Sequence, residues 1–283
     1  MDDLFDRFKP HFASWLQVYD MDKRWDYFIG ERKRVGSPLY YAAFCGLYDL
    51  AERLIMKHPE QVNAAGGFNL APLPAALSMN HFLVANLLHK HGAVVDVRGD
   101  ADWTPLHLAS YCGSVDITRW LLDHNAGANA RNRYSRTPLH MAARKTDVKI
   151  VQVLLEHNPE IDARDNEMGK TPLHDVLTLV DFFPHAKPVE TMRLLLEHGA
   201  DPNTRDDSDS TPLHRASSLG WLEIARLLLN HGANVDEKDG NSQTPFEVAA
   251  SKKFHKLTKL LLEHGAVPPL YVVYTSTSQY LRL

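Results

Sequence analysis

The sequence predicts an all-α solenoid of seven helix–turn–helix repeats. The tetrapeptide Thr-Pro-Leu-His occurs four times, beginning at Thr104, Thr137, Thr171 and Thr211. Weaker forms of it extend the series, so that its prolines stand at positions 38, 72, 105, 138, 172, 212 and 245. A second motif, close to Leu-Leu-Glu-His-Gly-Ala, recurs in step with these prolines. Two motifs that keep a common period along most of a chain indicate a repeat array.

Each repeat carries signals for two helices. Threonine is a helix-capping residue, and proline is favoured at the first helical position, where its missing N–H costs nothing. A glycine such as Gly46, Gly113 or Gly220 permits the tight turn between the helices. The second helix has an apolar stripe, for example over residues 150–155. His-Gly-Ala then ends it, with glycine in a left-handed cap and histidine near the negative end of the helix dipole.

These motifs resemble the ankyrin repeat, which has a period of ~33 residues and a T-P-L-H-x-A signature. The resemblance spans about residues 36–267 and implies an ankyrin-repeat solenoid with projecting turns, or fingers. Arg131–Arg136 and Arg205–Ser210 are two of these fingers. Because a single repeat cannot bury its own apolar face, we expect stability to come from stacking of neighbours.

We expect three segments: residues 1–29, the repeat array over 30–268, and a tail over 269–283. Phe5, Phe8, Phe12 and Trp15 have helical spacing and predict a helical cap over the open end of repeat one. A docking surface and a linker to a further domain are the alternatives for this segment. The tail is either a frayed end or a strip across the last repeat.

One interval between prolines is longer than the others and predicts an insertion in repeat five. The extra residues lie near Asp181–Pro188, between the two helices of that repeat. The adjacent Phe182 and Phe183 either contact a partner or pack against the helices of their own repeat.

Composition favours a protein inside the cell, and we expect it to be a monomer. The 283 residues carry a net charge of -4, which argues against general attraction to nucleic acid or membranes. Cys45 and Cys112 are too few for a disulfide framework. No apolar run approaches the ~20 residues that cross a bilayer, and the N-terminal MDDLFDRFKP lacks an apolar signal core. We therefore expect a soluble protein of the cytoplasm or the nucleus.

No motif predicts catalysis, a metal or a cofactor. Eleven of the sixteen histidines belong to the two repeated motifs, where hydrogen bonding and capping explain them. Repeats stacked ~10 Å apart cannot share a zinc ion whose ligands lie ~2 Å away. Gly169-Lys170-Thr171 resembles the end of a phosphate loop, but Arg164 stands where that loop needs glycine. Residues 1–29, the Asp181–Pro188 insertion and the tail offer His11, His185 and scattered acids, which form no recognisable catalytic arrangement.

The resemblance implies recognition of a protein by the finger tips and by the exposed positions of the first helices, which line a concave face. Placed on this sequence, it predicts a partner-binding site in repeats three to five. The site comprises Trp103, Tyr111, Arg133, Tyr134, Arg136, Arg144, Lys145, Met168 and Lys170. A wider set adds Cys112, Ser208, Ser210, Ser218, Leu219, Asn241 and Gln243, and also Phe44, Cys45, Phe68 and Met79.

Trp103, Tyr111, Tyr134 and Arg136 form the predicted centre, because Trp, Tyr and Arg most often anchor interfaces. Residues 130–150 carry six cations against Asp147, a net of +5, whereas residues 200–210 carry a net of -3. This pattern predicts a partner with an acidic segment, and solvated finger charges are the alternative. Nucleic acid is disfavoured, because the basic stretch is short and an acidic one lies close by.

A further resemblance suggests a different role. Residues 15–22 and 36–43 are similar to the ankyrin entry region of fungal NACHT–ankyrin proteins. This implies, as an alternative function, the sensor or regulatory half of a larger NACHT-type receptor that acts within its own chain. No nucleotide-binding module is found in this sequence, so the resemblance implies no ATPase activity.

Overall fold

A computed structural model describes residues 36–64, 71–178 and 187–269 of the chain. The chain divides into two compact units, Met1–Gly99 and Asp100–Leu283. Both contain α-helices and a short 3-10 helix, and no strand occurs among the described residues. The predicted all-α class is confirmed.

The first unit holds the helices of repeats one and two. In each repeat the two helices pack together, and α2 also packs on α4 while α3 packs on α5. Asn63 links the two repeats, because its amide donates to the Gly92 carbonyl at 2.9 Å and its oxygen accepts from the Val94 N–H at 2.8 Å. The elements are α2 Pro38–Phe44, α3 Tyr48–Lys57, η1 Pro59–Asn63, α4 Pro72–Ser78 and α5 Phe82–Lys90.

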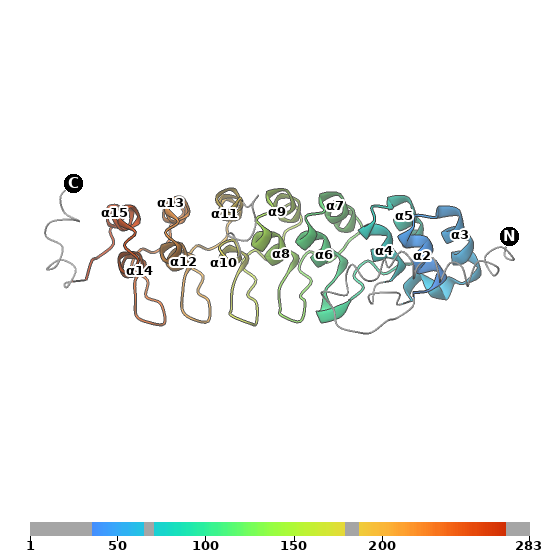
Figure 1. The fold of residues 1–283 in the computed structure, drawn as a ribbon, viewed down its shortest axis with the longest axis horizontal. Helices are drawn as coiled ribbons and strands as arrows, with labels where there is room; N and C mark the ends of the chain where they lie inside the picture. The colour runs from blue at the N-terminus through green and yellow to red at the C-terminus, as the bar shows by residue number, and fades with distance from the viewer. Residues whose placement is uncertain (1–35, 65–70, 179–186, 270–283) are drawn as a thin grey trace. The chain divides into compact units, whose positions relative to one another are not determined.

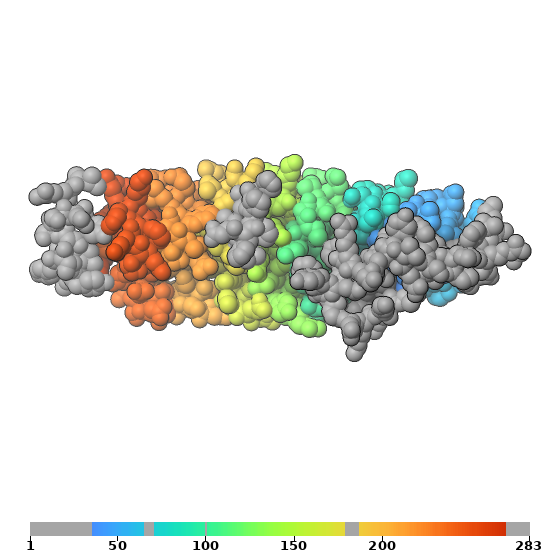
Figure 2. Space-filling view, viewed as in Figure 1, coloured from blue at the N-terminus to red at the C-terminus, as the bar shows by residue number. Residues whose placement is uncertain are grey.

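The second unit holds five further pairs of helices. First helices contact first helices of neighbouring repeats, and second helices contact second helices, so the unit has two layers with the fingers projecting on the first-helix side (Figure 1). The space-filling view shows its repeats as consecutive bands (Figure 2). Its elements are η3 Asp100–Asp102, α6 Pro105–Cys112, α7 Val115–Asp123, α8 Pro138–Lys145, α9 Val148–Leu155, α10 Pro172–Asp175, α11 Pro188–Glu197, α12 Pro212–Leu219, α13 Leu222–Asn230, α14 Pro245–Ser251 and α15 His255–Glu263.

The predicted threonine caps are present at all five first helices of this unit. In α8 the Thr137 side chain accepts the backbone N–H of His140, and His140 Nδ1 accepts the Thr137 N–H at 3.0 Å. The last repeat uses a carboxylate instead, since Glu247 accepts the Thr244 N–H at 2.9 Å. These reciprocal bonds satisfy two backbone donors that the helix itself leaves unpaired.

The turns after the first helices have the left-handed backbone that the sequence predicts. Gly113 and Gly220 have φ of 77° and 72°. Thr146 occupies the same place after α8 with φ of 52°, an unfavourable value for a β-branched residue. Its hydroxyl accepts the Lys187 N–H at 2.9 Å, which fixes the start of α11 against repeat four.

The core lies between the two layers and confirms the predicted apolar stripe. In α9 the stripe residues Ile150, Val151, Val153, Leu154 and Leu155 are all buried. The other second helices of the unit likewise bury apolar side chains, and successive second helices from α7 to α15 pack on one another. Within their own repeats, α7, α9, α13 and α15 also pack on the first helix.

Several predicted features lie outside the described residues. They are the helical cap and linker alternatives in residues 1–29, residues 181–186 of the insertion, Phe68, and the tail from residue 270. In repeat five, α10 has four helical residues, whereas α6, α8 and α12 have eight each. None of the described helices has the length and apolar character that a membrane span requires.

Candidate functional site

Equivalent positions in the repeats can be identified by counting residues from the proline that begins each first helix. Two residues before the proline stand Trp103, Arg136 and Lys170. Six residues after it stand Tyr111 in repeat three and Arg144 in repeat four. The next residues along are Cys112 and Lys145. Aromatic residues in repeat three are therefore followed by cations at the same positions of repeat four.

The structure brings three of the predicted residues into contact at α6 and α8: Trp103, Tyr111 and Lys145. With Arg144, which precedes Lys145 on α8, they form what we call the α6–α8 cluster. The Trp103 and Tyr111 rings meet edge to face with centroids 5.8 Å apart. The Lys145 ammonium lies 4.2 Å from the Tyr111 ring centroid. Tyr111 is 38% exposed, and the other three side chains are half-buried. A cation held over an aromatic ring and beside a second one forms a preorganised surface.

Three other predicted residues lie at the finger tips. Arg133 and Met168 are exposed, and Tyr134 lies at the exposed border. The tips are connected in series by backbone hydrogen bonds of 2.8–3.1 Å. These run from Arg133 N to Ala101 O, from Asn166 N to Tyr134 O, from Asp207 N to Met168 O, and from Gly240 N to Ser208 O. The fingers are thus held to one another within this unit.

Arg136 lies in a different environment from the other predicted residues. Its side chain is 16% exposed and pairs with Asp165 at 3.1 Å and with Glu167 at 2.7 Å. Asp165 also accepts the N–H groups of Met168 and Lys170. Burial on its own raises the pKa of Asp165, but these N–H groups and the Arg136 guanidinium outweigh it and hold the pKa below its usual range. The guanidinium of Arg136 is therefore engaged within the array.

Three arginines that the sequence analysis did not single out tie neighbouring fingers together. Arg131, Arg164 and Arg205 each donate to a backbone carbonyl one finger further along. Each also pairs with a carboxylate of that finger, namely Glu160, Asp207 and Glu237 respectively. Of the six cations in residues 130–150, Arg131 and Arg136 are thus paired with carboxylates of the next finger.

The motif histidines hold the next finger, as predicted. Their Nε2 atoms lie 2.9–3.2 Å from backbone carbonyl oxygens of the following repeat: His107 with Arg136, His140 with Lys170, His174 with Ser210, and His214 with Gln243. Burial lowers the pKa of His140 to about 4 and also lowers the pKa values of His174 and His214. Five histidines at the ends of the second helices instead place Nδ1 2.7–3.0 Å from the carbonyl oxygen four residues earlier: His124, His157, His198, His231 and His264.

Asp175, a residue the sequence analysis did not identify, is a buried carboxyl group on the first-helix face. It is fully buried, and its Oδ2 atom has no hydrogen-bond partner. Burial raises its pKa to about 6, although Arg136, Arg144 and Lys170 act in the opposite direction. Leu108 and Met141 occupy the same position in repeats three and four. An acidic residue at a position that is apolar in repeats three and four was the available sequence signal.

We predict that Asp175→Leu stabilises the protein at neutral pH. The pKa rises from 3.8 to about 6 on folding, so the charged carboxylate costs up to about 3 kcal/mol above pH 6 and nothing below pH 3.8. Urea unfolding at pH 7.5 should show a gain of about 1–3 kcal/mol, and the gain should disappear toward pH 4. Arg215→Leu, at the exposed equivalent position, is the control and should change stability by less than about 0.5 kcal/mol. An equal gain at both pH values would contradict the assignment.

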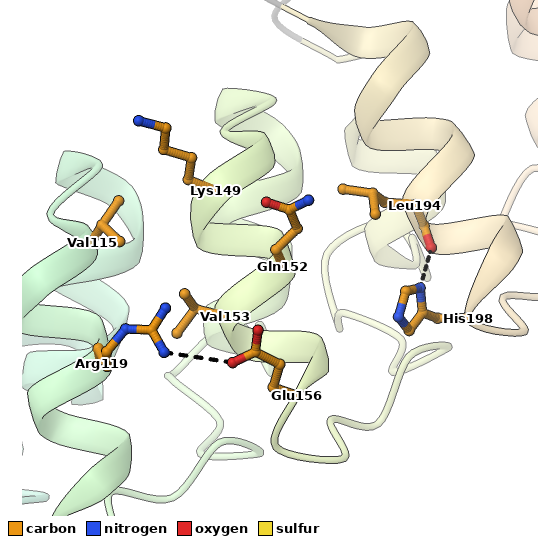
Figure 3. Close-up of a pocket in the computed structure, with 8 residues that line it drawn as sticks. All are labelled: Val115, Arg119, Lys149, Gln152, Val153, Glu156, Leu194 and His198. Carbon is orange, nitrogen blue, oxygen red and sulfur yellow. Dashed lines mark hydrogen bonds and ion pairs between the residues drawn. The ribbon is translucent and has the colours of Figure 1, made fainter.

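A groove of about 480 Å³ lies on the opposite, second-helix face, between α7, α9 and α11 (Figure 3). Val153 is buried in it, and Gln152 and His198 line it from α9 and α11. Arg119 and Glu156 pair across its α7–α9 side at 3.6 Å. None of the predicted partner-binding residues lines this groove.

The described residues offer no arrangement for metal binding or nucleophilic catalysis. They contain no group of three or more His, Cys, Asp or Glu side chains placed to hold a metal ion. Burial raises the pKa of the Cys45 and Cys112 thiols, in the opposite direction from an activated nucleophile.

Comparison with known proteins agrees with this geometry. The family model "Ankyrin repeats (3 copies)" matches residues 39–133, 125–206 and 180–270. The ankyrin repeat domain of Bcl-3, described as a unique member of the IkappaB protein family, is 29% identical with a TM-score of 0.72. That match covers 82% of this chain and 100% of the Bcl-3 chain. A search of curated proteins gave no significant match. Nothing in these comparisons tests the NACHT resemblance, which stays a prediction.

Proposed function

Because the chain belongs to the ankyrin-repeat family, we propose that it is a non-catalytic module that binds a protein partner through the first-helix and finger face of repeats three to five. The observation that carries the proposal is the α6–α8 cluster. It combines two aromatic rings in contact with a lysine held over one of them, on the face that the arginine and histidine contacts between fingers make rigid. Large aromatic side chains with few rotatable bonds bury much area at low entropic cost, which suits an interface anchor.

The finger tips extend this surface. Arg133, Tyr134 and Met168 lie on neighbouring fingers that backbone hydrogen bonds hold together. Lys170 is half-buried at the position equivalent to Trp103, two repeats along. Arg136 contributes indirectly, because its ion pairs position the finger that carries Met168. In this proposal the chain acts as a monomer in the cytoplasm or nucleus and needs no cofactor.

The experiment is affinity capture from a lysate with matched variants. Trp103→Ala with Tyr111→Ala removes the aromatic part of the cluster. Ser251→Ala with Lys252→Ala changes two exposed residues of repeat seven, at the positions equivalent to Tyr111 and Lys145, and is the control. We expect the first pair to lower recovery of the captured protein, identified by mass spectrometry, by at least tenfold and the control pair to leave it unchanged.

Circular dichroism and thermal unfolding of both variants separate lost binding from lost structure. Equal recovery by the folded aromatic variant and the wild type would contradict the proposed site. If neither pair of substitutions lowers recovery of the captured protein, the interface lies elsewhere on the chain.

A further inference from the structure

Resting on the proposed function, we propose that the α6–α8 cluster selects a protein segment in which a large apolar side chain lies about three residues from a carboxylate. The apolar side chain would pack on Trp103 and Tyr111. The carboxylate would bind at Arg144 and be attracted by Lys145 as well. This assigns the chemical class of the partner segment and the spacing of its two recognised groups.

The aromatic end of the cluster provides the apolar contact. Trp103 is half-buried against His107, with ring centroids 6.0 Å apart, and Tyr111 meets its edge. Both rings are thus fixed before binding, while Tyr111 keeps 38% of its surface exposed. Rings that are already ordered lose little conformational entropy on binding.

The cationic end provides the contact for an anion. Arg144 forms no ion pair with any carboxylate of the described residues, and the carboxyl that it influences, Asp175, is fully buried beneath this face. Lys145 is placed over the Tyr111 ring, so its charge lies directly beside the apolar surface. A carboxylate bound at Arg144 would lie about one repeat from the Tyr111 ring and would also be attracted by the Lys145 ammonium.

The spacing follows from the repeat geometry. Tyr111 and Arg144 occupy the same position in consecutive repeats, which stack ~10 Å apart. A polyproline II chain rises ~3.1 Å per residue and completes a turn every three residues, so side chains three positions apart lie on one face about 9 Å apart and can reach the two sites. The predicted motif is therefore an aromatic or large aliphatic residue, two intervening residues, and Asp or Glu, in either chain direction.

The charge around the cluster favours an acidic peptide over nucleic acid. Beyond repeat four, residues 200–210 carry four carboxylates against one arginine, Arg205, a net charge of -3. A long polyanion that follows the array would meet these acids, whereas a short segment with one or two carboxylates would not.

The experiment selects 12-residue peptides from a random phage-displayed library on the whole chain. We expect the recovered peptides to share the apolar-x-x-acid spacing. The best peptide should bind at least tenfold more weakly, by fluorescence anisotropy, to Lys145→Glu and to Arg144→Glu. Lys252→Glu is the matched control, because Lys252 is exposed directly after α14, at the position equivalent to Lys145. The preceding repeat has Ser218 at the position equivalent to Tyr111, so Lys252 has no aromatic ring there. Replacement of the peptide carboxylate by its amide should weaken binding to the wild type by a similar factor.

The outcomes separate this inference from the proposed function. Peptides that depend on Trp103 and Tyr111 but carry no acid, or that bind Lys145→Glu normally, would overturn the partner class and leave the site intact. If none of the selected peptides needs Trp103 and Tyr111 for binding, the result would count against the site itself. Displacement of the peptide by a single-stranded oligonucleotide from the wild type but not from Lys145→Glu would identify nucleic acid as the ligand instead.

Discussion

Acidification from pH 7.5 to pH 4 is expected to remove the contribution that neutral His140 makes to the stability of the repeat array, about 3 kcal/mol of the free energy of unfolding. Burial lowers the pKa of His140 from 6.5 to about 4, and it lowers the pKa values of His174 and His214 in the same direction. A group whose pKa is lower in the folded than in the unfolded state stabilises the fold fully at pH values above its unfolded-state pKa. That stability is lost as the pH falls through the folded value. For His140 the shift corresponds to about 3 kcal/mol between pH 6.5 and pH 4.

The hydrogen bonds of His140 explain why the neutral form is required. Its Nδ1 accepts the Thr137 N–H at 3.0 Å, so the proton must lie on Nε2, which donates to the Lys170 carbonyl at 3.1 Å. A second proton on Nδ1 would remove the helix cap and place a charge at a fully buried position. Asp175 has the opposite effect, because its protonation between pH 6 and pH 3.8 stabilises the fold. The net change in stability therefore also depends on His174 and His214.

Urea unfolding of the wild type and of His140→Gln across this pH range tests the assignment. Glutamine can still accept the Thr137 N–H, as Glu247 does for Thr244 in repeat seven, but it does not titrate. We expect His140→Gln to be less stable than the wild type at pH 7.5 and to lose about 3 kcal/mol less on acidification. The exposed His231→Gln controls for the loss of an imidazole elsewhere. A pH profile of His140→Gln parallel to that of the wild type would refute the role of His140.

The parts of the fold that recur in the sequence were predictable, because each rests on local chemistry repeated at constant spacing. The caps at Thr104 and Thr137, the turns at Gly113 and Gly220, and the apolar stripe of residues 150–155 are all present. Each depends on a few neighbouring residues, so a motif in the sequence is sufficient to specify it.

The missed features depend on contacts between repeats. The fingers are joined through Arg131, Arg164 and Arg205, whose spacing of 33 and 41 residues follows the repeat but whose partners lie about a repeat away. The burial of Asp175 depends on what packs over the first-helix face of repeat five. Arg136 has the sequence character of an interface anchor, and its pairing with Asp165 appears only once neighbouring fingers are placed together.

Arg136→Ala is expected to destabilise the array by about 3–5 kcal/mol, because it leaves a buried carboxylate without its cation. The Asp165 side chain has no exposed surface, and its Oδ2 receives both Arg136 bonds, each 3.1 Å long. The carboxylate would keep the N–H groups of Met168 and Lys170, which hold it ionised but do not neutralise it. The finger that carries Met168 should therefore loosen along with the global loss of stability.

Arg133→Ala is the matched control, since Arg133 lies three residues away in the same finger with an exposed side chain. It should change the free energy of unfolding by less than about 0.5 kcal/mol in urea titrations. Asp165→Asn combined with Arg136→Ala should cost less than the sum of the single variants, because the uncompensated charge is removed along with its partner. If Arg136→Ala unfolds like Arg133→Ala, the ion pair does not stabilise the array and Arg136 is available to a partner. If the predicted cost is found, loss of binding in an Arg136 variant reports a disturbed finger, and the interface must be mapped with Trp103, Tyr111, Arg144 and Lys145.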